Sequence, residues 1–380
     1  MKIAINTRYL LPAYLEGCGN FIFEVFSRLA RRFPQHEFIY IFDRPFDQRF
    51  ITSSNIRAVV AGPPARHPLL WKLWYDIKVP LVLRRQKADV FVSGDGFCSL
   101  TTSVPQCLVV HDLAFLHFPS YINRTQLFYY KRYTPYFLKK AASIATVSSF
   151  SKQDIVASYG IGPERIDVVY NGVRDGFRPL DEMLRQEIRD RYTAGKNYFI
   201  CSGAIQPRKN LINLLKAFSV FKKRQKSDWK LVLAGRLAWK HDQFTASLRK
   251  YKYRSDVVLT GYLPDSELEA LTASAYAMVY PSLWEGFGVP VLEAMRCRVT
   301  VLTSVDSSMA EIAGEAALYA SPGDYQDIAE KMMRLYKDEA LCNRMKEQGA
   351  VIAASYSWDR TADLMWEVIL KAIPGATHKS

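Results

Sequence analysis

The sequence predicts an α/β protein with two doubly wound domains. Short apolar runs of strand length alternate with helical patterns along the chain, which is typical of parallel sheets covered by helices on both faces. The chain has 380 residues, more than a single hydrophobic core usually supports. Near its middle, residues 170–179 hold two glycines and one proline and are the best candidate for a linker between domains.

In the first half of the chain, before the linker, predicted strands and helices follow one another several times. Its opening strand comes directly after Met1, and the later strands are apolar runs bounded by turn residues. Its helices carry apolar residues three and four positions apart. The predicted strands are residues 2–6, 38–42, 56–61, 90–93, 107–110 and 143–147, and the predicted helices are residues 21–32, 69–85, 124–142 and 149–159.

After the linker the pattern begins again, with helical segments between the strands. Asn20 and Asn210 stand where a helix could begin and are candidate N-caps, as are Asp265 and Ser266 further along. A last helix is expected at about residues 358–372. The predicted strands of this half are residues 198–202, 230–234, 257–260, 276–280 and 299–303.

Composition excludes several classes of protein. With 49% hydrophobic and 23% charged residues, the chain is globular rather than disordered. It has no run of 18 apolar residues that would span a membrane, and its start is too short and too polar for a signal peptide. The six cysteines are scattered without paired spacing, which indicates a reduced cytoplasm and no metal cluster. No Asp-x-Asp pair is present either, so a metal is not implied.

The net charge is +14, and most of it belongs to the first half. Residues 1–180 contain 23 basic and 13 acidic side chains, whereas residues 181–380 contain 28 and 24. Basic and aromatic residues alternate in 67–85 and 128–140, a combination suited to an anionic membrane surface. The same pattern also fits a core face with solvated lysines outside it. Both interpretations stay open at the level of sequence.

The most distinctive motif lies at residues 282–297. It follows an apolar run typical of a buried strand, and Pro290 suits the first turn of the next helix. Glu285 is therefore expected on the loop after a strand, with Glu293 about one turn into the helix. Two carboxylates around such a corner can bind two sets of hydroxyls. Taken singly, each glutamate is equally well explained as a helix-dipole partner.

Glycines at this and one other strand end favour close approach by an anion. Gly286 and Gly288 lie before the helix that begins near Pro290, and Gly17 and Gly19 follow the first strand. Backbone amides at a helix N-terminus bind phosphates well, although a two-glycine loop alone is a weak signal. His111 follows another strand, where it could serve a ligand or bond to the backbone as a structural histidine.

Arg208 and Lys209 form the second strong signal. They precede a helix that Asn210 could cap, and two cations there oppose the helix dipole. A bound diphosphate would offset that charge through charge-assisted hydrogen bonds. Arginine offers a forked contact and lysine a point charge.

Taken together, these motifs resemble those of the retaining glycosyltransferases of family 4. Residues 282–297 are similar to that family's glutamate–seven residues–glutamate signature, and residues 203–211 to its Gly…Pro-Arg-Lys-Asn element. The first glycine loop, His111-Asp112, the linker and the last helix are similar to family elements in the same order. The chain departs from the pattern at Arg174, which precedes Asp175, and at Arg296 and Arg298, where small residues are usual.

The resemblance implies the GT-B fold, in which two Rossmann-like domains face a cleft. Residues 1–175 would form the acceptor-side domain and residues 176–357 the nucleotide-sugar-binding domain. Residues 358–380 would cross back to the first domain. The implied catalytic residues are His111, Arg208, Lys209 and Glu285. The implied donor-binding residues are Gly17, Gly19, Tyr262, Leu263, Gly286, Phe287, Gly288 and Glu293.

Roles also follow from the resemblance. Arg208 and Lys209 would bind the donor phosphates, Glu285 the hydroxyls of the sugar, and Glu293 the ribose diol. His111 would lie beside the transferred sugar as a polar clamp. Tyr262 and the backbone at Leu263 would flank the nucleobase, and the amides of residues 286–288 would orient the sugar.

The expected function is that of a retaining, metal-independent hexosyltransferase. It would move a hexose, mannose-like among the candidates, from a UDP- or GDP-linked donor to a glycan or lipid-linked acceptor, with no further cofactor. This reaction would belong to lipopolysaccharide or other surface polysaccharide synthesis, in the cytoplasm or at the inner face of the cell membrane. The alternatives are a sugar-nucleotide epimerase, which shares the fold, and a non-catalytic module that binds sugar nucleotides or nucleic acid.

Overall fold

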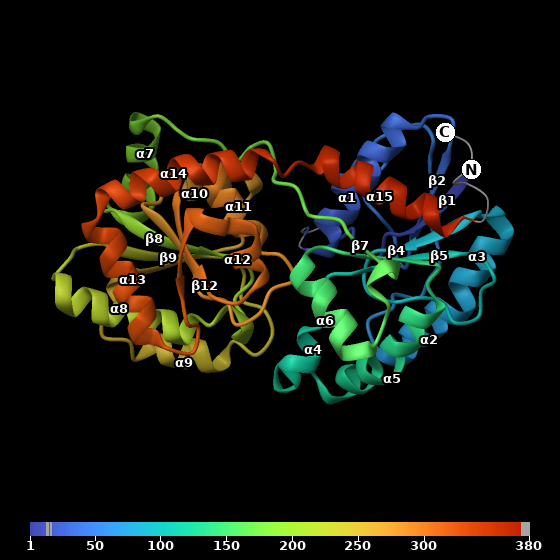
Figure 1. Cartoon of the computed structure of the whole chain (residues 1–380), viewed down its shortest axis with the longest axis horizontal. Coiled ribbons are helices and arrows are strands. Elements are labelled where there is room, and N and C mark those ends of the chain that lie inside the picture. Colours follow the sequence, from blue (N-terminus) through green and yellow to red (C-terminus); the bar gives the residue numbers. More distant parts are fainter. Residues whose placement is uncertain (13–14, 16, 374–380) are drawn as a thin grey trace. The chain divides into compact units, whose positions relative to one another are not determined.

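The chain folds into two units (Figure 1). The structure is a computed structural model and describes residues 1–12, 15 and 17–373. Unit 1 consists of Met1–Gly172 together with Trp358–Ser380, and unit 2 of Val173–Ser357. Glu16 of the predicted glycine loop and residues 374–380 of the predicted last segment lie outside the described residues.

Unit 1 is built on a parallel sheet with the order β3-β2-β1-β4-β5-β6-β7. The interior strand β1 pairs with β2 on one side, through Ile3 and Phe38, and with β4 on the other, through Ile3 and Val90. The order therefore reverses between β1 and β4. The strands are β1 (Lys2–Asn6), β2 (Glu37–Phe42), β3 (Ile56–Val60), β4 (Val90–Ser93), β5 (Gln106–Val110), β6 (Ser143–Thr146) and β7 (Ile166–Val168).

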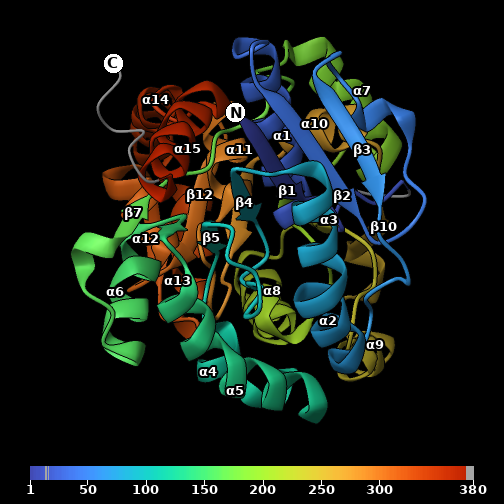
Figure 2. The ribbon, with the colours of Figure 1, turned by 90° about the vertical axis from the view of Figure 1, so that its right-hand side faces the viewer.

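Helices cover both faces of this sheet, as right-handed crossovers require. On one face α1 and α15 lie side by side, and α15 packs against β4, β5 and β6 (Figures 1 and 2). On the other face α3 packs against β2, α5 against β5, and α6 against β6. The helices of this unit are α1 (Cys18–Arg32), α2 (Pro68–Leu73), η2 (Trp74–Lys78), α3 (Val79–Gln86), α4 (Ala114–His117), α5 (Arg124–Lys140), α6 (Ser149–Tyr159) and α15 (Trp358–Ala372).

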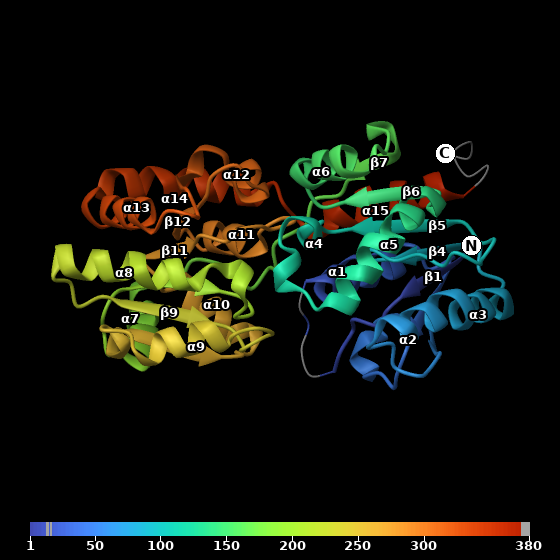
Figure 3. The same cartoon turned by 90° about the horizontal axis from the view of Figure 1, so that it is seen from below.

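Unit 2 repeats the doubly wound design with the order β10-β9-β8-β11-β12-β13, which reverses between β8 and β11. Here α8 packs against α9 and α13, and α11 packs against α10 and α14 (Figure 3). The strands are β8 (Tyr198–Ser202), β9 (Lys230–Ala234), β10 (Val257–Gly261), β11 (Ala277–Tyr280), β12 (Thr300–Ser304) and β13 (Ala317–Ala320). The helices are α7 (Glu182–Thr193), α8 (Leu211–Gln225), α9 (Asp242–Arg249), α10 (Asp265–Ala273), α11 (Val289–Arg296), α12 (Ser308–Ala313), α13 (Tyr325–Lys337) and α14 (Glu339–Ala354).

Short 3₁₀ turns complete the two units. They are η1 (Gln48–Phe50), η3 (Pro119–Tyr121), η4 (Pro163–Arg165), η5 (Pro207–Lys209), η6 (Arg254–Asp256) and η7 (Gly314–Ala316). Across the part of the chain that is described, no helix combines the length and the apolar character needed to cross a bilayer.

The predicted class, two doubly wound α/β domains, is confirmed, and the differences are local. The predicted helix 69–85 is interrupted by the π-helical turn η2, because Pro80 has no N–H to donate to the preceding turn. Asn20 does not cap α1, which begins two residues earlier after Gly17. Strands β7 and β13 were missed, since each is a short strand at a sheet edge.

Residues 67–85 and 128–140 could form either a membrane-facing surface or a core face. For their largest aromatic rings, the packing of the core shows which interpretation holds. Trp71, Trp74 and Phe137 are at most 5% exposed and belong to the core of unit 1. The indole N–H groups of both tryptophans donate to backbone carbonyls, of Ala65 and Ala61 at 2.8 Å each. These rings are therefore core residues, and a membrane surface would have to use other side chains.

Candidate functional site

The candidate site of unit 2 lies where the strand order of its sheet reverses. Open α/β sheets bind ligands at the carboxyl ends of the strands at such a point. Residues 203–211 follow β8 and residues 281–288 follow β11, the two strands on either side of the reversal. The topology thus brings the two strongest sequence motifs to one sheet edge.

Glu285 joins the two motifs through its carboxylate. Its Oε1 accepts hydrogen bonds from Lys209 Nζ at 2.7 Å and from Ser282 Oγ at 2.6 Å. Its Oε2 accepts from Arg208 Nη1 at 2.9 Å. The Tyr280 hydroxyl donates to Oε1 at 3.2 Å and also contacts Lys209 Nζ. Lys209 and Glu285 are each 8% exposed, so this is a buried ion cluster.

This cluster corrects one step of the sequence argument. The two cations were expected to lack compensation without a diphosphate, but Glu285 compensates them in the protein itself. Burial raises the pKa of Glu285, yet Arg208 and Lys209 outweigh burial and lower it to about 2. One carboxylate against two cations leaves a net charge of +1, which still favours an anionic ligand.

Backbone contacts hold the two loops together. Leu283 N donates to the Arg208 carbonyl at 2.8 Å, and Ser282 Oγ donates to the same oxygen at 3.0 Å. Asn210 occupies the N-cap position of α8, as predicted, but its backbone is left-handed and its side chain makes no capping hydrogen bond. Its side-chain amide instead donates to the carbonyls of Pro281 at 3.0 Å and Pro322 at 2.6 Å.

The turn before α11 needs glycine at one position. Gly288 has φ of 101° and occupies the N-cap position of α11, and a Cβ there would lie 2.6 Å from Met309 Cγ. Ser308 Oγ donates to the carbonyls of Glu285 and Phe287, at 2.7 and 3.2 Å, and fixes the turn. Pro290 stands in the first turn of α11, as predicted.

Glu293 lies in the same helix but has a different partner, which the sequence analysis did not predict. Arg174 donates to Glu293 Oε1 from Nη2 at 2.8 Å and from Nε at 3.2 Å. Its Nη1 donates to Asp265 Oδ1 at 2.6 Å. In the sequence, the one signal for this pairing is that Arg174 departs from the family's linker pattern.

The residues predicted to flank the nucleobase precede Asp265 in the chain. Tyr262 and Leu263 are on the loop between β10 and α10, and Tyr262 is 48% exposed. Neither Asp265 nor Ser266 caps α10, because Pro264 stands at the N-cap position and Asp265 turns to Arg174. Arg174 thus links the start of α10 to Glu293.

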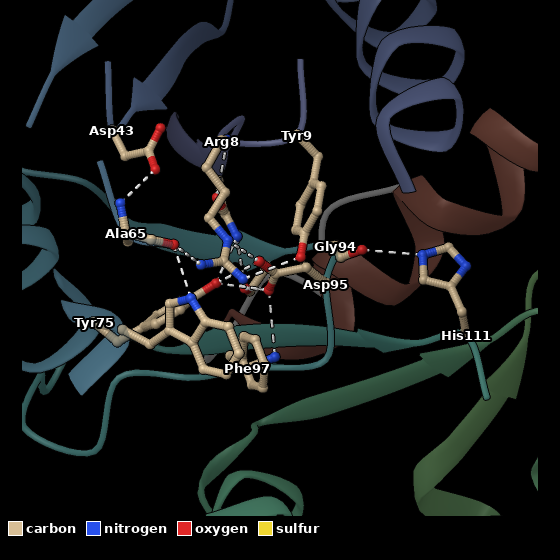
Figure 4. A network of polar contacts seen from close by, with 12 residues as sticks. Arg8, Tyr9, Asp43, Ala65, Tyr75, Gly94, Asp95, Phe97 and His111 are labelled. Atoms are coloured by element: carbon tan, nitrogen blue, oxygen red, sulfur yellow. Dashed lines mark hydrogen bonds and ion pairs between the residues drawn. The ribbon is translucent and has the colours of Figure 1, made fainter. Parts of the chain in front are cut away.

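Unit 1 carries a second buried ion pair at its own strand reversal (Figure 4). Arg8 follows β1 and Asp95 follows β4, and Arg8 Nε donates to Asp95 Oδ2 at 2.7 Å. Both side chains are at most 3% exposed. Asp95 also accepts from the Tyr75 hydroxyl at 2.6 and 2.7 Å, and Arg8 lies within 5.7 Å of four aromatic rings, those of Tyr9, Trp71, Tyr75 and Phe97.

His111 is connected to this network through the same loop. Its Nε2 lies 3.0 Å from the carbonyl oxygen of Gly94, the residue before Asp95 (Figure 4). Burial lowers the pKa of His111, but Cys18 and the Gly94 carbonyl raise it, to about 9. The backbone bond is the one that a structural histidine makes.

The predicted glycine loop stands at the start of α1 in unit 1. Gly17 has φ of 41°, and a Cβ on Gly19 would lie 2.5 Å from the Tyr9 carbonyl oxygen. The structure brings together Arg208, Lys209, Glu285 and the turn 286–288. Arg174 links Glu293 to Asp265, two residues after Leu263. His111, Gly17 and Gly19 belong to unit 1. In the part of the chain that the structure describes, no group of three or more histidine, cysteine or acidic side chains could hold a metal ion.

Comparison with known proteins agrees with this geometry. The family profile described as "Glycosyl transferases group 1" matches residues 185–351, and the profile "Glycosyltransferase Family 4" matches residues 16–176. The chain is 29% identical to O-antigen chain mannosyltransferase B of Escherichia coli over 77% of this chain and 78% of that protein. It is 31% identical to the Escherichia coli serotype-specific mannosyltransferase WbdA, over 60% of this chain but only 29% of that longer protein.

A solved structure supports the fold independently. The crystal structure of Anabaena Alr3699/HepE in complex with UDP-glucose superposes with a TM-score of 0.77 over 97% of this chain and 98% of that one. The identity is 17%, so this likeness concerns the fold alone. These matches lend no support to an epimerase or a non-catalytic binding module. Two profiles that together span most of the chain, and the doubly wound sheets they imply, show that this chain belongs to the group 1 glycosyltransferases, with the GT-B fold.

Proposed function

We propose that this chain transfers a hexose of the mannose type from a UDP- or GDP-linked donor to a glycan or lipid-linked acceptor in surface polysaccharide synthesis. The observation that carries the proposal is the buried cluster of Arg208, Lys209 and Glu285 at the strand reversal of unit 2. The names of both mannosyltransferase relatives support the sugar, and the O-antigen in one of these names supports the pathway class. The UDP-glucose complex supports the donor class.

The cluster suits departure of a nucleoside diphosphate. Breaking the bond between sugar and phosphate places negative charge on the phosphates and positive charge on the sugar. Arg208, Lys209 and the N-terminus of α11 would stabilise the leaving phosphates, and such preorganised electrostatic stabilisation is usually the largest catalytic contribution. Glu285 would accept from sugar hydroxyls while holding both cations in place, and Glu293 would accept from the ribose. Tyr262 would stack on the base.

Retention of configuration is part of the proposal. Arg208 and Lys209 already engage both oxygens of Glu285, an arrangement that favours an orienting role over a nucleophilic one. The acceptor would then attack on the face from which the diphosphate leaves, and a donor phosphate oxygen would take the acceptor proton. No step of this route requires a metal ion or a further cofactor.

In this proposal, unit 1 binds the acceptor and contacts the membrane. Its strand reversal holds the Arg8–Asp95 pair among aromatic rings, of which Tyr9 is 37% exposed and suited to stack on a sugar. Leu69, Ile77 and Leu81 on α2–α3 are exposed, as are Phe128 and Tyr136 on α5. These side chains lie among lysines and arginines, so we propose that they contact an anionic inner membrane surface that carries the acceptor.

The test is a transfer assay with a panel of donors. Purified protein is incubated with UDP-glucose, UDP-galactose or GDP-mannose, with and without a lipid-linked glycan acceptor and with EDTA. We expect nucleoside diphosphate release with one donor, stimulated by acceptor and unaffected by EDTA. NMR of the product should show the anomeric configuration of the donor. Inversion, or strict dependence on a divalent cation, would contradict this mechanism.

A further inference from the structure

Arg174 and Glu293 form an ion pair, and the proposed function gives a role to Glu293 alone. Glu293 is 4% exposed and lies in α11. A carboxylate so well buried stays ionised only when a cation or several donors compensate it. Among the described residues, the hydrogen bonds to Glu293 come from Arg174 alone.

The other groups around Glu293 are acidic or neutral. Asp265 and Glu269 on α10 face it, and Cys297 follows it at the end of α11. The pKa of Glu293 lies above its usual value, because burial and Asp265 raise it by more than Arg174 lowers it. Without Arg174, two neighbouring carboxylates and the loss of solvent would all favour the protonated form. A protonated Glu293 would be a poorer acceptor for a ribose hydroxyl.

The geometry of the pair leaves one carboxylate oxygen available. Arg174 Nε and Nη2 both converge on Oε1, at 3.2 and 2.8 Å. The guanidinium is held in this orientation by Asp265, which accepts from Nη1 at 2.6 Å, and by the ring of Phe177, whose centroid lies 4.9 Å from its Cζ. Oε2 accepts from none of these donors. In the proposed donor site, it is the oxygen left to accept from a ribose hydroxyl.

We infer that Arg174 is a positioning residue for ribose recognition: it holds Glu293 by one oxygen, so that the other reads the ribose diol of the donor. This inference rests on the proposed donor site and goes beyond it by naming what orients Glu293. It makes the preference for ribose over 2′-deoxyribose a property of the pair and not of Glu293 alone.

The experiment compares binding of UDP and GDP with that of their 2′-deoxy forms by titration calorimetry. In the unchanged protein, we expect whichever of UDP and GDP binds to have an affinity about tenfold or more higher than that of its 2′-deoxy form. This is the effect of losing a hydrogen bond to a charged group. Arg174→Ala should weaken binding of the ribonucleotide, so that the ratio of the two affinities falls to about twofold or less. Affinity for the 2′-deoxy form should stay within about twofold.

Three further variants make the result decisive. Arg178→Ala removes the same charge from an exposed position of the same segment and should leave the ratio unchanged. Arg174→Lys keeps the charge but not the forked contact and should give an intermediate ratio. Arg174→Gln combined with Glu293→Gln keeps the packing without buried charge. It should reproduce the ratio of Glu293→Gln alone, and it remains informative if Arg174→Ala does not fold.

The outcomes separate this inference from the proposed function. Failure of the unchanged protein to bind either ribonucleotide would contradict the donor site itself. Binding with equal affinity for ribose and 2′-deoxyribose, or a ratio that Glu293→Gln changes and Arg174→Ala does not, would overturn the role of Arg174. Equal weakening of both forms by Arg174→Ala would show that Arg174 contacts the base or phosphates instead.

Discussion

At the residue scale, Glu285 compensates two neighbouring cations in the protein itself, the buried Lys209 and the half-buried Arg208. Each carboxylate oxygen has its own cationic donor, Lys209 for Oε1 and Arg208 for Oε2. Removing one partner from such a cluster leaves another charge uncompensated. Substitutions here are therefore expected to change stability as well as activity, and conservative variants are the more informative ones.

Acid should destabilise unit 2 through Glu285. Its pKa is about 2 in the folded protein and near 4.5 when unfolded, so its stabilising contribution is present above pH 4.5 and is lost as pH falls toward 2. The contribution is on the order of 3 kcal/mol. Denaturant unfolding between pH 6 and pH 3 should show a smaller loss of stability for Glu285→Gln than for the unchanged protein. Glu330→Gln, an exposed control, should follow the unchanged protein; identical curves for all three would refute the assignment.

Arg208→Lys should remain folded and lose turnover. The lysine keeps a positive charge beside Glu285 but cannot make the forked contact with phosphate. We expect a loss of about 10²-fold or more in the transfer rate, as for the removal of an oxyanion donor. Lys223→Ala, which removes an exposed charge from α8 of the same unit, serves as the control. Transfer by Arg208→Lys at the unchanged rate would show that Arg208 does not bind the leaving group.

The two glutamates should differ in what they affect. Glu293→Gln is expected to weaken binding of the free nucleoside diphosphate by about 1.5–3 kcal/mol, because its partner is the ribose. Glu285→Gln should leave that affinity equal or tighter, since it releases Arg208 and Lys209 to the phosphates, yet turnover should fall. Titration calorimetry and the transfer assay measure the two effects. Equal weakening of nucleotide binding by both variants would show that the roles have been divided incorrectly.

At the scale of elements, the sheet edge of unit 2 depends on turns that hold two loops in register. Asn210 with its left-handed backbone and the Leu283–Arg208 hydrogen bond join the loop after β8 to the loop after β11. In unit 1 the loop after β4 does the same for Arg8, through Asp95, and for His111, through Gly94. In unit 2 the loops that carry the charged side chains are joined by backbone contacts, whereas in unit 1 the Asp95 carboxylate holds Arg8 directly.

Gly288→Ala should test the turn that begins α11. Its φ of 101° is unfavourable for alanine, and the added Cβ would lie 2.6 Å from Met309 Cγ. We expect a loss of stability of about 1–3 kcal/mol and weaker binding of nucleoside diphosphate, because the amides of the turn would shift. Thermal unfolding measures the stability, and titration calorimetry measures the binding of nucleoside diphosphate.

Gly323→Ala is the matched control for this variant. Gly323 lies in the same unit, and no atom lies within 4 Å of its added Cβ. Gly323→Ala should leave the stability and the affinity for nucleoside diphosphate unchanged. Nucleotide binding by Gly288→Ala as tight as that of the control would exclude this turn from the donor site.

At the scale of the whole molecule, both units use the same topology for the same purpose. Each sheet reverses its strand order beside its first strand, β1 or β8, and each reversal holds an arginine–carboxylate pair, which is buried in unit 1 and partly exposed at Arg208 in unit 2. The pairs differ in their surroundings: aromatic rings surround Arg8, whereas Arg208 lies beside Lys209 and a helix N-terminus. This difference suits a sugar in unit 1 and a diphosphate in unit 2.

Unit 1 is expected to bind anionic vesicles, and unit 2 is not. Most of the net charge lies in residues 1–180, and each basic residue near an anionic leaflet contributes about 1 kcal/mol. Sedimentation with anionic but not neutral vesicles, relieved by salt, is the expected result. Charge reversal of the exposed residues Lys131, Arg132, Lys139 and Lys140 should reduce binding without changing nucleotide affinity.

The control for vesicle binding reverses as many charges on unit 2. Lys223, Arg224, Lys226 and Arg249 are exposed there, and their reversal should leave the anionic-vesicle fraction near that of the unchanged protein. Equal losses for both variants would indicate an effect of net charge alone. No sedimentation with anionic vesicles at low salt would mean that the basic face of unit 1 does not serve a membrane.

The sequence by itself determined the fold class, most strands and the positions of the charged motifs, because apolar periodicity and turn residues are local signals. Strands such as β1, β8 and β9 agree with their predicted limits. It also identified Arg208, Lys209, Glu285 and Glu293 as candidates, since they lie in recognisable motifs.

Only the tertiary structure decided which of these side chains meet. Residues 208 and 285 are far apart in the chain, and their pairing depends on β8 and β11 being neighbours in the sheet. The same holds for Arg174 with Glu293 and for Arg8 with Asp95. Ion pairs of this kind depend on distances of a few ångströms between segments remote in sequence, and no local pattern encodes those distances.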